Sequence, residues 1–275
     1  MKNWTIKALY YGKITMPKEF FTPGLDAGLM LDIPYLGYLL QNGEENVLVD
    51  AGIHEEHIVN SRAWGGYPAE GGTQFVLEAL AREGLGPDDI TSVIYTHLHN
   101  DHAGAAVHFK DKLTYVQKDE FANLFHQLPS QKLRGDFDDR TKEDILQYTN
   151  LCLIDNDIEL SNGLKLYKAG GHTLGSQMIV VPTESGKYII VGDLAIVPCV
   201  LFPQLDRMTL LDGKQIAITP APEEEGAHFK YTSLIYDHFA ACDSFYKMKA
   251  LAQKYEPRYI LCGHDPEAIV KHDIA

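Results

Sequence analysis

Apolar and polar positions alternate over several short stretches of the chain, and this period of two predicts β-strands. An opening strand is expected over residues 5–11, and two apolar runs at 33–40 and 46–50 flank Gln41-Asn42-Gly43-Glu44. Asn-Gly between such runs predicts a β-hairpin. Glycine-containing turns at 161–163 and 184–186 predict two more hairpins. The further strands are expected near 92–96, 112–116, 151–155, 164–168, 177–182, 187–192 and 259–262.

A helical period of the apolar positions appears in fewer places. Thr73 is expected to cap a helix that buries Phe75, Val76 and Leu80, and a small-residue helix is expected to begin at Ala103. Other helices are predicted over residues 119–127 and from Thr232 to about Lys254. Strands, helices, more strands, then a helix and a strand predict an α/β fold of two packed sheets with helices outside.

Three segments interrupt this pattern, and we treat them as insertions in a single domain spanning residues 1–275. Residues 53–72 hold many glycines and are expected to form a flexible loop that covers a site. Residues 129–150 are polar and predict a surface insertion of helix and loop. Residues 197–231 contain four prolines. The first and third segments are candidates for a lid or for a subunit contact in a homodimer.

Composition excludes several classes of partner. The formal net charge of −14 disfavours DNA and RNA, and no basic cluster offsets it. The four cysteines are far apart, and the N-terminal residues lack the apolar core of a signal peptide. No run approaches the ~20 apolar residues of a membrane span. We therefore expect a cytoplasmic protein without a membrane or nucleic-acid partner.

The densest chemistry lies in His97-Leu98-His99-Asn100-Asp101-His102, directly after the predicted strand at 92–96. In extended chain, the side chains of His97 and His99 point to the same side, so that one ion can take both. The chain must then turn, so Asp101 and His102 face elsewhere. A catalytic zinc normally takes three protein ligands, which suggests two adjacent metals here and further ligands downstream.

Three downstream residues have suitable chemistry at the ends of predicted strands. His172 lies in Ala169-Gly170-Gly171-His172-Thr173-Leu174-Gly175, Asp193 follows an apolar run that ends at Gly192, and His264 follows Gly263. Side chains at strand ends can converge on one edge of a sandwich. Seven candidate metal ligands result: His97, His99, Asp101, His102, His172, Asp193 and His264.

The His-x-His-x-Asp-His run, the Gly-His-Thr-x-Gly segment, the strand-ending Asp193 and the Gly-His-Asp at 263–265 resemble the metallo-β-lactamase superfamily, in that family's order. The resemblance implies an αβ/βα sandwich of two mixed sheets with helices on the outer faces. It also implies one metal on His97, His99 and His172, a second on Asp101, His102 and His264, and a bridging Asp193. Asp50 resembles a family position that orders the site by hydrogen bonding.

Such a dinuclear centre predicts a hydrolase in which a metal-bridging hydroxide attacks a carbonyl, because metals lower the pKa of water to roughly 7. Asp101 is the candidate proton carrier. Zinc is the first expectation for both ions, and iron, manganese and cobalt suit the same ligands. The spacing and the Gly-His-Asp ending are most similar to the quorum-quenching N-acyl-homoserine lactone lactonases. A lactone of this or a related small type is therefore the expected substrate.

Two positions depart from that lactonase branch. Asn100 replaces an aromatic residue that many members place before the motif Asp, and Leu194, Ala195 and Ile196 follow Asp193 where many have a substrate-contacting tyrosine. Tyr231 and Tyr67 are candidates for a replacement phenol. Phe20, Phe21, Leu25, Leu29, Met30, Leu201 and Phe202 are candidates for an acyl-chain cleft, each more simply explained as a packing residue.

Other activities stay open from the sequence. A glyoxalase II-like thioesterase or another metal-dependent ester hydrolase would use the same seven ligands. A persulfide dioxygenase shares His-x-His-x-Asp-His but uses a single iron. An RNA-processing hydrolase is disfavoured by the net charge, and a protein that binds metal without catalysis has no need of seven ligands.

Overall fold

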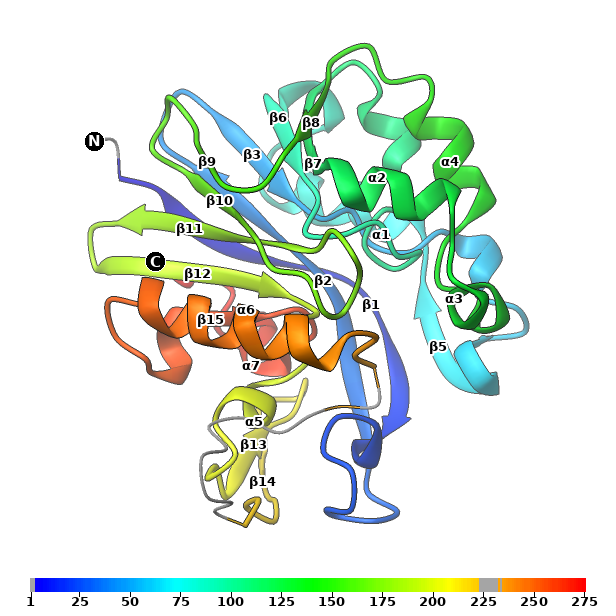
Figure 1. Cartoon of the computed structure of the whole chain (residues 1–275), viewed down its shortest axis with the longest axis vertical. Helices are drawn as coiled ribbons and strands as arrows, with labels where there is room; N and C mark the ends of the chain where they lie inside the picture. Colours follow the sequence, from blue (N-terminus) through cyan, green and yellow to red (C-terminus); the bar gives the residue numbers. More distant parts are fainter. Residues whose placement is uncertain (1–2, 223–231, 233) are drawn as a thin grey trace.

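The alternating apolar positions form two β-sheets that pack face to face in the computed structural model, which describes residues 3–222, 232 and 234–275 (Figure 1). The larger sheet has eight strands in the order β4-β5-β1-β2-β3-β6-β7-β8. Its strands are β1 (Thr5–Pro17), β2 (Met30–Gln41), β3 (Asn46–Val49), β4 (Arg62–Ala63), β5 (Tyr67–Gly71), β6 (Ser92–Ile94), β7 (Leu113–Gln117) and β8 (Leu151–Ile154).

The second sheet has five strands in the order β15-β12-β11-β10-β9. They are β9 (Ile158–Glu159), β10 (Lys165–Lys168), β11 (Gln177–Thr183), β12 (Gly186–Gly192) and β15 (Ile260–Cys262). A separate two-stranded sheet pairs β13 (Arg207–Thr209) with β14 (Gln215–Ala217). Both larger sheets mix parallel and antiparallel pairs, since β3, β6, β7 and β8 run parallel in one and β12 and β15 in the other.

The period of two assigns alternate residues to different layers. Ile6 and Ala8 of β1 lie in the same buried cluster as Ile179 and Val181 of β11, which fills the space between the sheets. Leu9 belongs instead to the cluster on the outer faces, where helices pack. Burying each such aliphatic side chain contributes roughly 1.5–3 kcal/mol, so this double burial favours the four-layer arrangement.

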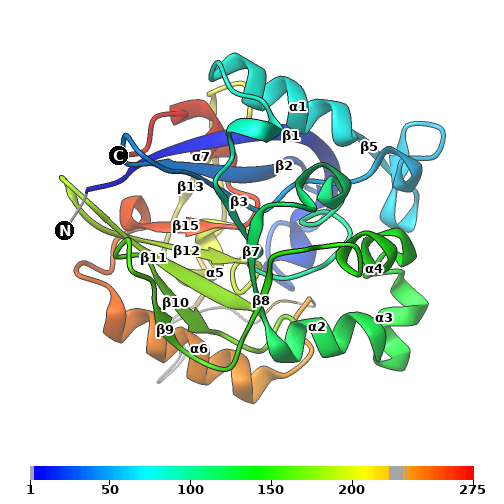
Figure 2. The ribbon, with the colours of Figure 1, turned by 90° about the horizontal axis from the view of Figure 1, so that it is seen from above.

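Helices cover the outer faces of both sheets. Figure 2 shows α1 outside β1 and β2, and α6 on the opposite side of the molecule outside β10, β11 and β12. The helices are α1 (Thr73–Arg82), α2 (Lys118–Phe125), α3 (Pro129–Arg134), α4 (Asp139–Ile145), α5 (Pro198–Leu201), α6 (His238–Leu251) and α7 (Pro266–Lys271). This is the expected αβ/βα sandwich. None of the helices in the described ranges is long and apolar enough to cross a membrane.

Two strand predictions were wrong. Residues 53–72 do not form one irregular loop, because β5 pairs with β1 and β4 pairs with β5. The expected hairpin between residues 151–155 and 164–168 does not form either. Strand β8 pairs in parallel with β7, while the short β9 is the antiparallel partner of β10. The turn at 161–163 was located correctly, but its first strand is only two residues long.

Three helix predictions also need correction. Gly72, not Thr73, is the N-cap of α1, and Thr73 donates to the Glu55 carboxylate instead. Turns and a short 3-10 helix (Ala106–Phe109) replace the helix expected from Ala103. Helix α6 begins at His238 rather than Thr232, because the Asp237 side chain accepts a hydrogen bond from the Ala240 amide at 2.9 Å and caps it.

Candidate metal centre

The structure brings all seven predicted ligands together at one end of the sandwich, on loops that follow strands. The His97–His102 loop follows β6, His172 lies between β10 and β11, and Asp193 and His264 follow the parallel strands β12 and β15. Their side chains form three groups of neighbouring ligand atoms, each within 4.8 Å: His97, His99 and His172; His97, His102 and Asp193; and Asp101, His102 and His264. All seven residues are buried.

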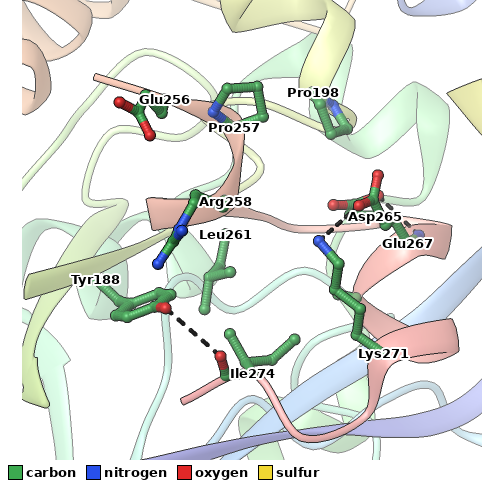
Figure 3. A pocket seen from close by; sticks show the side chains of 11 residues that line it. Tyr188, Pro198, Glu256, Pro257, Arg258, Leu261, Asp265, Glu267, Lys271 and Ile274 are labelled. Carbon is green, nitrogen blue, oxygen red and sulfur yellow. Dashed lines mark hydrogen bonds and ion pairs between the residues drawn. The ribbon is translucent and has the colours of Figure 1, made fainter. Parts of the chain in front are cut away.

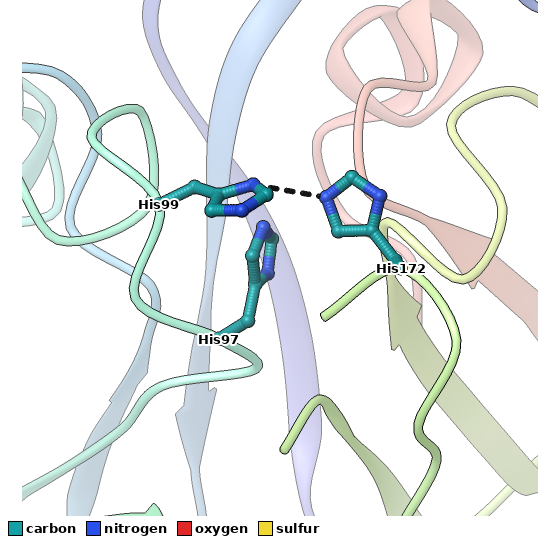
Figure 4. Close-up of side chains that lie close together, drawn as sticks. All are labelled: His97, His99 and His172. Atoms are coloured by element: carbon teal, nitrogen blue, oxygen red, sulfur yellow. Dashed lines mark hydrogen bonds between the residues drawn. The ribbon is translucent and has the colours of Figure 1, made fainter. Parts of the chain in front are cut away.

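The first group consists of three imidazoles whose rings face one another (Figure 4). His172 Nε2 lies 3.0 Å from His99 Nδ1, and the ring centroids of His97 and His172 are 4.8 Å apart. Phe137 packs its ring 4.9 Å from that of His99. Three imidazoles that converge beside the apolar Phe137 ring form a ligand set that zinc commonly binds in proteins.

The Asp193 carboxylate lies between this first group and the group formed by Asp101, His102 and His264, which is called the second group below. Its oxygens are 3.5 Å from His172 Nε2, 3.3 Å from His102 Nε2 and 3.2 Å from His264 Nε2. Asp101 lies farther out, 3.7 Å from His264 Nε2 and 3.9 Å from His102 Nε2. The Asp193 side chain therefore contacts nitrogen atoms of both groups.

The hydrogen bonds of the histidines orient free nitrogen lone pairs toward the centre. His102 Nδ1 faces Asp50 Oδ2, His172 Nδ1 faces the Leu234 carbonyl and His264 Nδ1 faces the Pro34 carbonyl, each at 2.8 Å. Because these oxygens only accept, each Nδ1 carries the proton and Nε2 is left as a donor to metal.

Several inward-facing atoms have no hydrogen-bond partner among the described residues. They are His97 Nε2, His99 Nε2, Asp101 Oδ1, His102 Nε2 and Asp193 Oδ1, and all are buried. Leaving so many buried polar atoms without partners is costly unless a ligand satisfies them. The donor set of imidazole and carboxylate groups thus fits divalent metal ions, and does not select among zinc, iron, manganese and cobalt.

Asp50 holds the His97–His102 loop in place through hydrogen bonds to Thr96 and His102. It has φ of 61° and follows β3, where its two oxygens accept from the Thr96 amide and the Thr96 hydroxyl, both at 2.7 Å. The Thr96 oxygen in turn lies 3.0 Å from His97 Nδ1. A single carboxylate therefore sets the tautomers of His97 and His102, one ligand from each group, as expected for this position.

Burial and neighbouring charges shift the histidine pKa values in two directions. Burial, with the neighbouring imidazoles, holds the pKa of His97 and His99 well below the ordinary range, and burial lowers that of His172 to about 4. For His102 and His264, burial also disfavours the charged ring, but the Asp193 carboxylate outweighs it and raises the pKa of both. The first group is consequently neutral at physiological pH, the form that binds metal.

Sequence reasoning missed Glu120, a buried residue of α2 that joins two ligand loops. Its Oε1 accepts from the Leu98 amide at 2.9 Å, between His97 and His99. Its Oε2 accepts from the Thr173 hydroxyl at 2.5 Å and from the Gly175 amide at 3.1 Å, beside His172. An acidic residue in the first turn of a helix is usually exposed, so nothing in the sequence indicated that Glu120 is buried beside the site.

Replacing Glu120 with alanine is expected to lower the free energy of unfolding by about 2–4 kcal/mol, because three buried donors lose their acceptor. Burial raises the Glu120 pKa to about 7 from its ordinary 4.5. The folded protein thus retains a proton that the unfolded chain releases, and this contribution is lost as the pH rises through 7. Urea unfolding should show the difference from wild type shrinking between pH 5 and pH 8. Glu143→Ala, at an exposed position of α4, is the control; equal losses in both variants would contradict the prediction.

The other site candidates have different outcomes. Tyr231 lies outside the described residues. Tyr67 packs edge-on against Phe20 with centroids 6.0 Å apart, and among the described residues no hydrogen bond or ring contact joins it to the seven. Tyr35 is the buried phenol beside the site, with its ring centroid 6.3 Å from that of His264. Of the apolar cleft candidates, Phe21 and Leu201 are core residues.

A cavity of about 570 Å³ is lined by residues of β12, β15 and α7 and of the segments beside them (Figure 3). Tyr188, Arg258, Leu261, Asp265 and Lys271 are among its lining residues, and none of the seven metal-ligand candidates is. Asp265 is the N-cap of α7 and accepts from the Glu267 amide at 2.9 Å. The structure thus favours the capping role for Asp265 over orientation of His264.

Comparison with known proteins identifies the family of the chain. Residues 34–264 match the metallo-beta-lactamase superfamily. The N-acyl homoserine lactonase AiiA of Bacillus thuringiensis subsp. kurstaki is 30% identical over 200 residues, which cover 69% of this chain and 76% of the relative. AiiB of Agrobacterium fabrum, also an N-acyl homoserine lactonase, is 38% identical over 99 residues, covering 34% and 36% of the two chains.

Solved structures show the same fold. An N-acyl homoserine lactone hydrolase with the product N-hexanoyl-L-homoserine at its catalytic metal centre superposes with a TM-score of 0.73 at 24% identity, covering 98% of this chain and 97% of that one. The dizinc quorum-quenching lactonase AidC gives 0.65 at 18% identity, with coverage of 95% and 87%. Because the family model covers residues 34–264, the chain belongs to the metallo-beta-lactamase superfamily, and the relatives named above are N-acyl homoserine lactonases.

Proposed function

We propose that the protein is a dinuclear metal-dependent lactonase that opens N-acyl homoserine lactones or related small lactones. Membership of the superfamily and its lactonase relatives make it a hydrolase of ester bonds. The observation that carries the finer proposal is the pair of buried ligand groups joined through Asp193. Lactonase relatives with this chemistry direct the choice of a lactone over a thioester.

In this proposal His97, His99 and His172 hold one ion, Asp101, His102 and His264 hold the second, and Asp193 contacts both. When bound, the two ions lower the pKa of water and polarise an ester carbonyl. The chain supplies the rest. Asp50 and the backbone carbonyls keep the imidazoles in the required tautomer. The buried walls exclude bulk water, and Asp101, at the outer side of the second group, carries a proton to the leaving alkoxide.

A single-iron oxygenase is the alternative with different stoichiometry. It would need one ligand group, whereas the structure holds a second group that is equally buried. Retaining Asp101, His102 and His264 in a buried cluster without a metal would cost free energy, because Asp101 Oδ1 and His102 Nε2 have no hydrogen-bond partner among the described residues. This contrast favours two metals per chain.

The test is metal stoichiometry by elemental analysis of protein purified without chelators, together with pH-stat titration of lactone hydrolysis. We expect close to two divalent ions per chain, acid release with N-acyl homoserine lactones, and loss of turnover after chelation that zinc, manganese or cobalt restores. One iron per chain with thiol-dependent oxygen uptake and no acid release would contradict the proposal. Faster cleavage of a thioester than of any lactone would shift it to a thioesterase.

A further inference from the structure

A second cluster of polar residues lies beside the first ligand group and has no part in the proposed metal binding. Arg134 is the last residue of α3, and its Nε lies 3.1 Å from Asp136 Oδ1. Tyr236 donates its hydroxyl to the other oxygen of Asp136. The rings of Trp64 and Tyr236 lie 5.7 Å and 5.3 Å from the guanidinium carbon. Two aromatic rings and a buried carboxylate therefore hold this guanidinium in a fixed orientation.

Backbone contacts tie this cluster to both loops of the first ligand group. The Asn100 amide donates to the Asp136 carbonyl at 2.8 Å, and the Asn100 side chain donates to the Gly135 carbonyl at 2.7 Å. On the other side, the Tyr236 amide donates to the carbonyl of Gly171, the residue before His172, at 2.9 Å. The charge of Arg134 is one of those that lower the pKa of His99 and His172. Arg134 is thus positioned at the edge of the metal centre.

The donors of this cluster exceed the acceptors that the described residues offer them. A guanidinium has five N–H donors, and pairing with one carboxylate occupies at most two of them. About a third of the Arg134 side chain stays exposed (31%), whereas Asp136 is fully buried. The indole N–H of Trp64 is buried and has no acceptor among the described residues. Within the described residues these donors have no further acceptor, so a bound molecule that carries an oxygen acceptor can pair with them.

We propose that Arg134 is a specificity-determining residue that binds an oxygen acceptor, a carbonyl or a carboxylate, on the substituent of the lactone substrate. This inference rests on the proposed lactonase function and deepens it. The guanidinium keeps its charge, but the Arg134–Asp136 pair carries no net charge, so that it suits a neutral amide carbonyl as well as an anion. Asn100 contributes by anchoring the 135–137 turn, which gives a role to the residue that replaces an aromatic in the motif.

The test compares three substrates: an unsubstituted γ-lactone, an N-acyl homoserine lactone with its amide carbonyl, and a γ-lactone that carries a carboxylate. Replacing Arg134 with methionine is expected to lower the ratio of kcat/KM for an acceptor-bearing substrate over the unsubstituted lactone by about tenfold, mainly through KM. Arg134→Lys should restore only part of this ratio, because a lysine lacks the planar fork. The acceptor class is the one whose ratio falls.

A merely structural role for Arg134 would reduce turnover of all three substrates together and leave the ratios unchanged, which would overturn the proposal. Arg82→Met, at an exposed position of α1, is the matched control and should leave the ratios unchanged. Calorimetry with an acylamino γ-lactam, which is not a lactone and need not turn over, gives a separate readout. Weaker binding to Arg134→Met than to wild type supports the proposal even if wild type opens no lactone, and equal binding overturns it.

Discussion

Replacing Asp193 with alanine is expected to lower lactone hydrolysis by at least about a thousandfold, because loss of one metal removes several kcal/mol of transition-state stabilisation and each 1.36 kcal/mol is tenfold in rate. The carboxylate lies within 3.5 Å of ligand nitrogens from both groups, so no other side chain can replace its contacts. Metal content should fall below two ions per chain at the same time. Elemental analysis and pH-stat kinetics measure the two effects on one preparation.

Folding should survive this substitution, because the hydrophobic clusters on both faces of the sheets do not include Asp193. Asp243→Ala removes an exposed carboxylate from α6 and serves as the control, with metal content and turnover at the wild-type level. Full metal content and activity in Asp193→Ala would contradict the assignment of Asp193 as the shared ligand. Loss of activity with two ions still bound would instead restrict Asp193 to a role in orienting His102 and His264.

The seven candidate ligands could be selected from the sequence because each lies close after a predicted strand. Parallel pairing of β12 with β15 aligns Gly192 with Cys262, and this register places Asp193 near His264 without any further requirement. The strand pattern and the residue types were thus sufficient to predict the sandwich and the convergence of the seven residues. Their assignment to two metals came from the family resemblance, and it stays a prediction.

The residues around the ligands could not be predicted, since their roles depend on contacts between distant segments. Glu120 and Arg134 lie on short helices with charged neighbours, and the local pattern for both is that of exposed residues. The start of α6 was misplaced because the apolar period continues upstream of Asp237. The helix begins only after Asp237, whose side chain caps its N-terminus by accepting from the Ala240 amide. Strand β5 was missed because its proline and its glycine are unfavourable in strands, whereas pairing with β1 stabilises the strand in the folded protein.

Introducing a single methyl group at Gly263 is expected to disable the centre and destabilise the fold. A Cβ at this position would lie 2.0 Å from Asp193 Oδ1 and 2.9 Å from the Gly192 carbonyl carbon, so the carboxylate cannot keep its place. The backbone cannot yield easily, because the Gly263 and His264 amides donate to the carbonyls of Ala195 and Ile196 at 3.1 Å and 2.9 Å. Overpacking of this kind costs about 1–3 kcal/mol. Thermal unfolding of Gly263→Ala should therefore begin at a lower temperature.

Displacement of Asp193 in this variant should weaken metal binding by about 10–100-fold, the usual effect of disturbing the residues that orient a ligand. Competition with a chromophoric chelator measures this weakening at a temperature where the variant is still folded, which separates loss of the site from loss of the fold. Gly86→Ala is the matched control, since its nearest contact would be Asp89 Oδ2 at 3.8 Å and its φ of −122° suits alanine. Wild-type metal affinity in Gly263→Ala would mean that Asp193 can bind from a second position. The close approach of β12 and β15 would then serve packing only, and would not be what positions the Asp193 carboxylate.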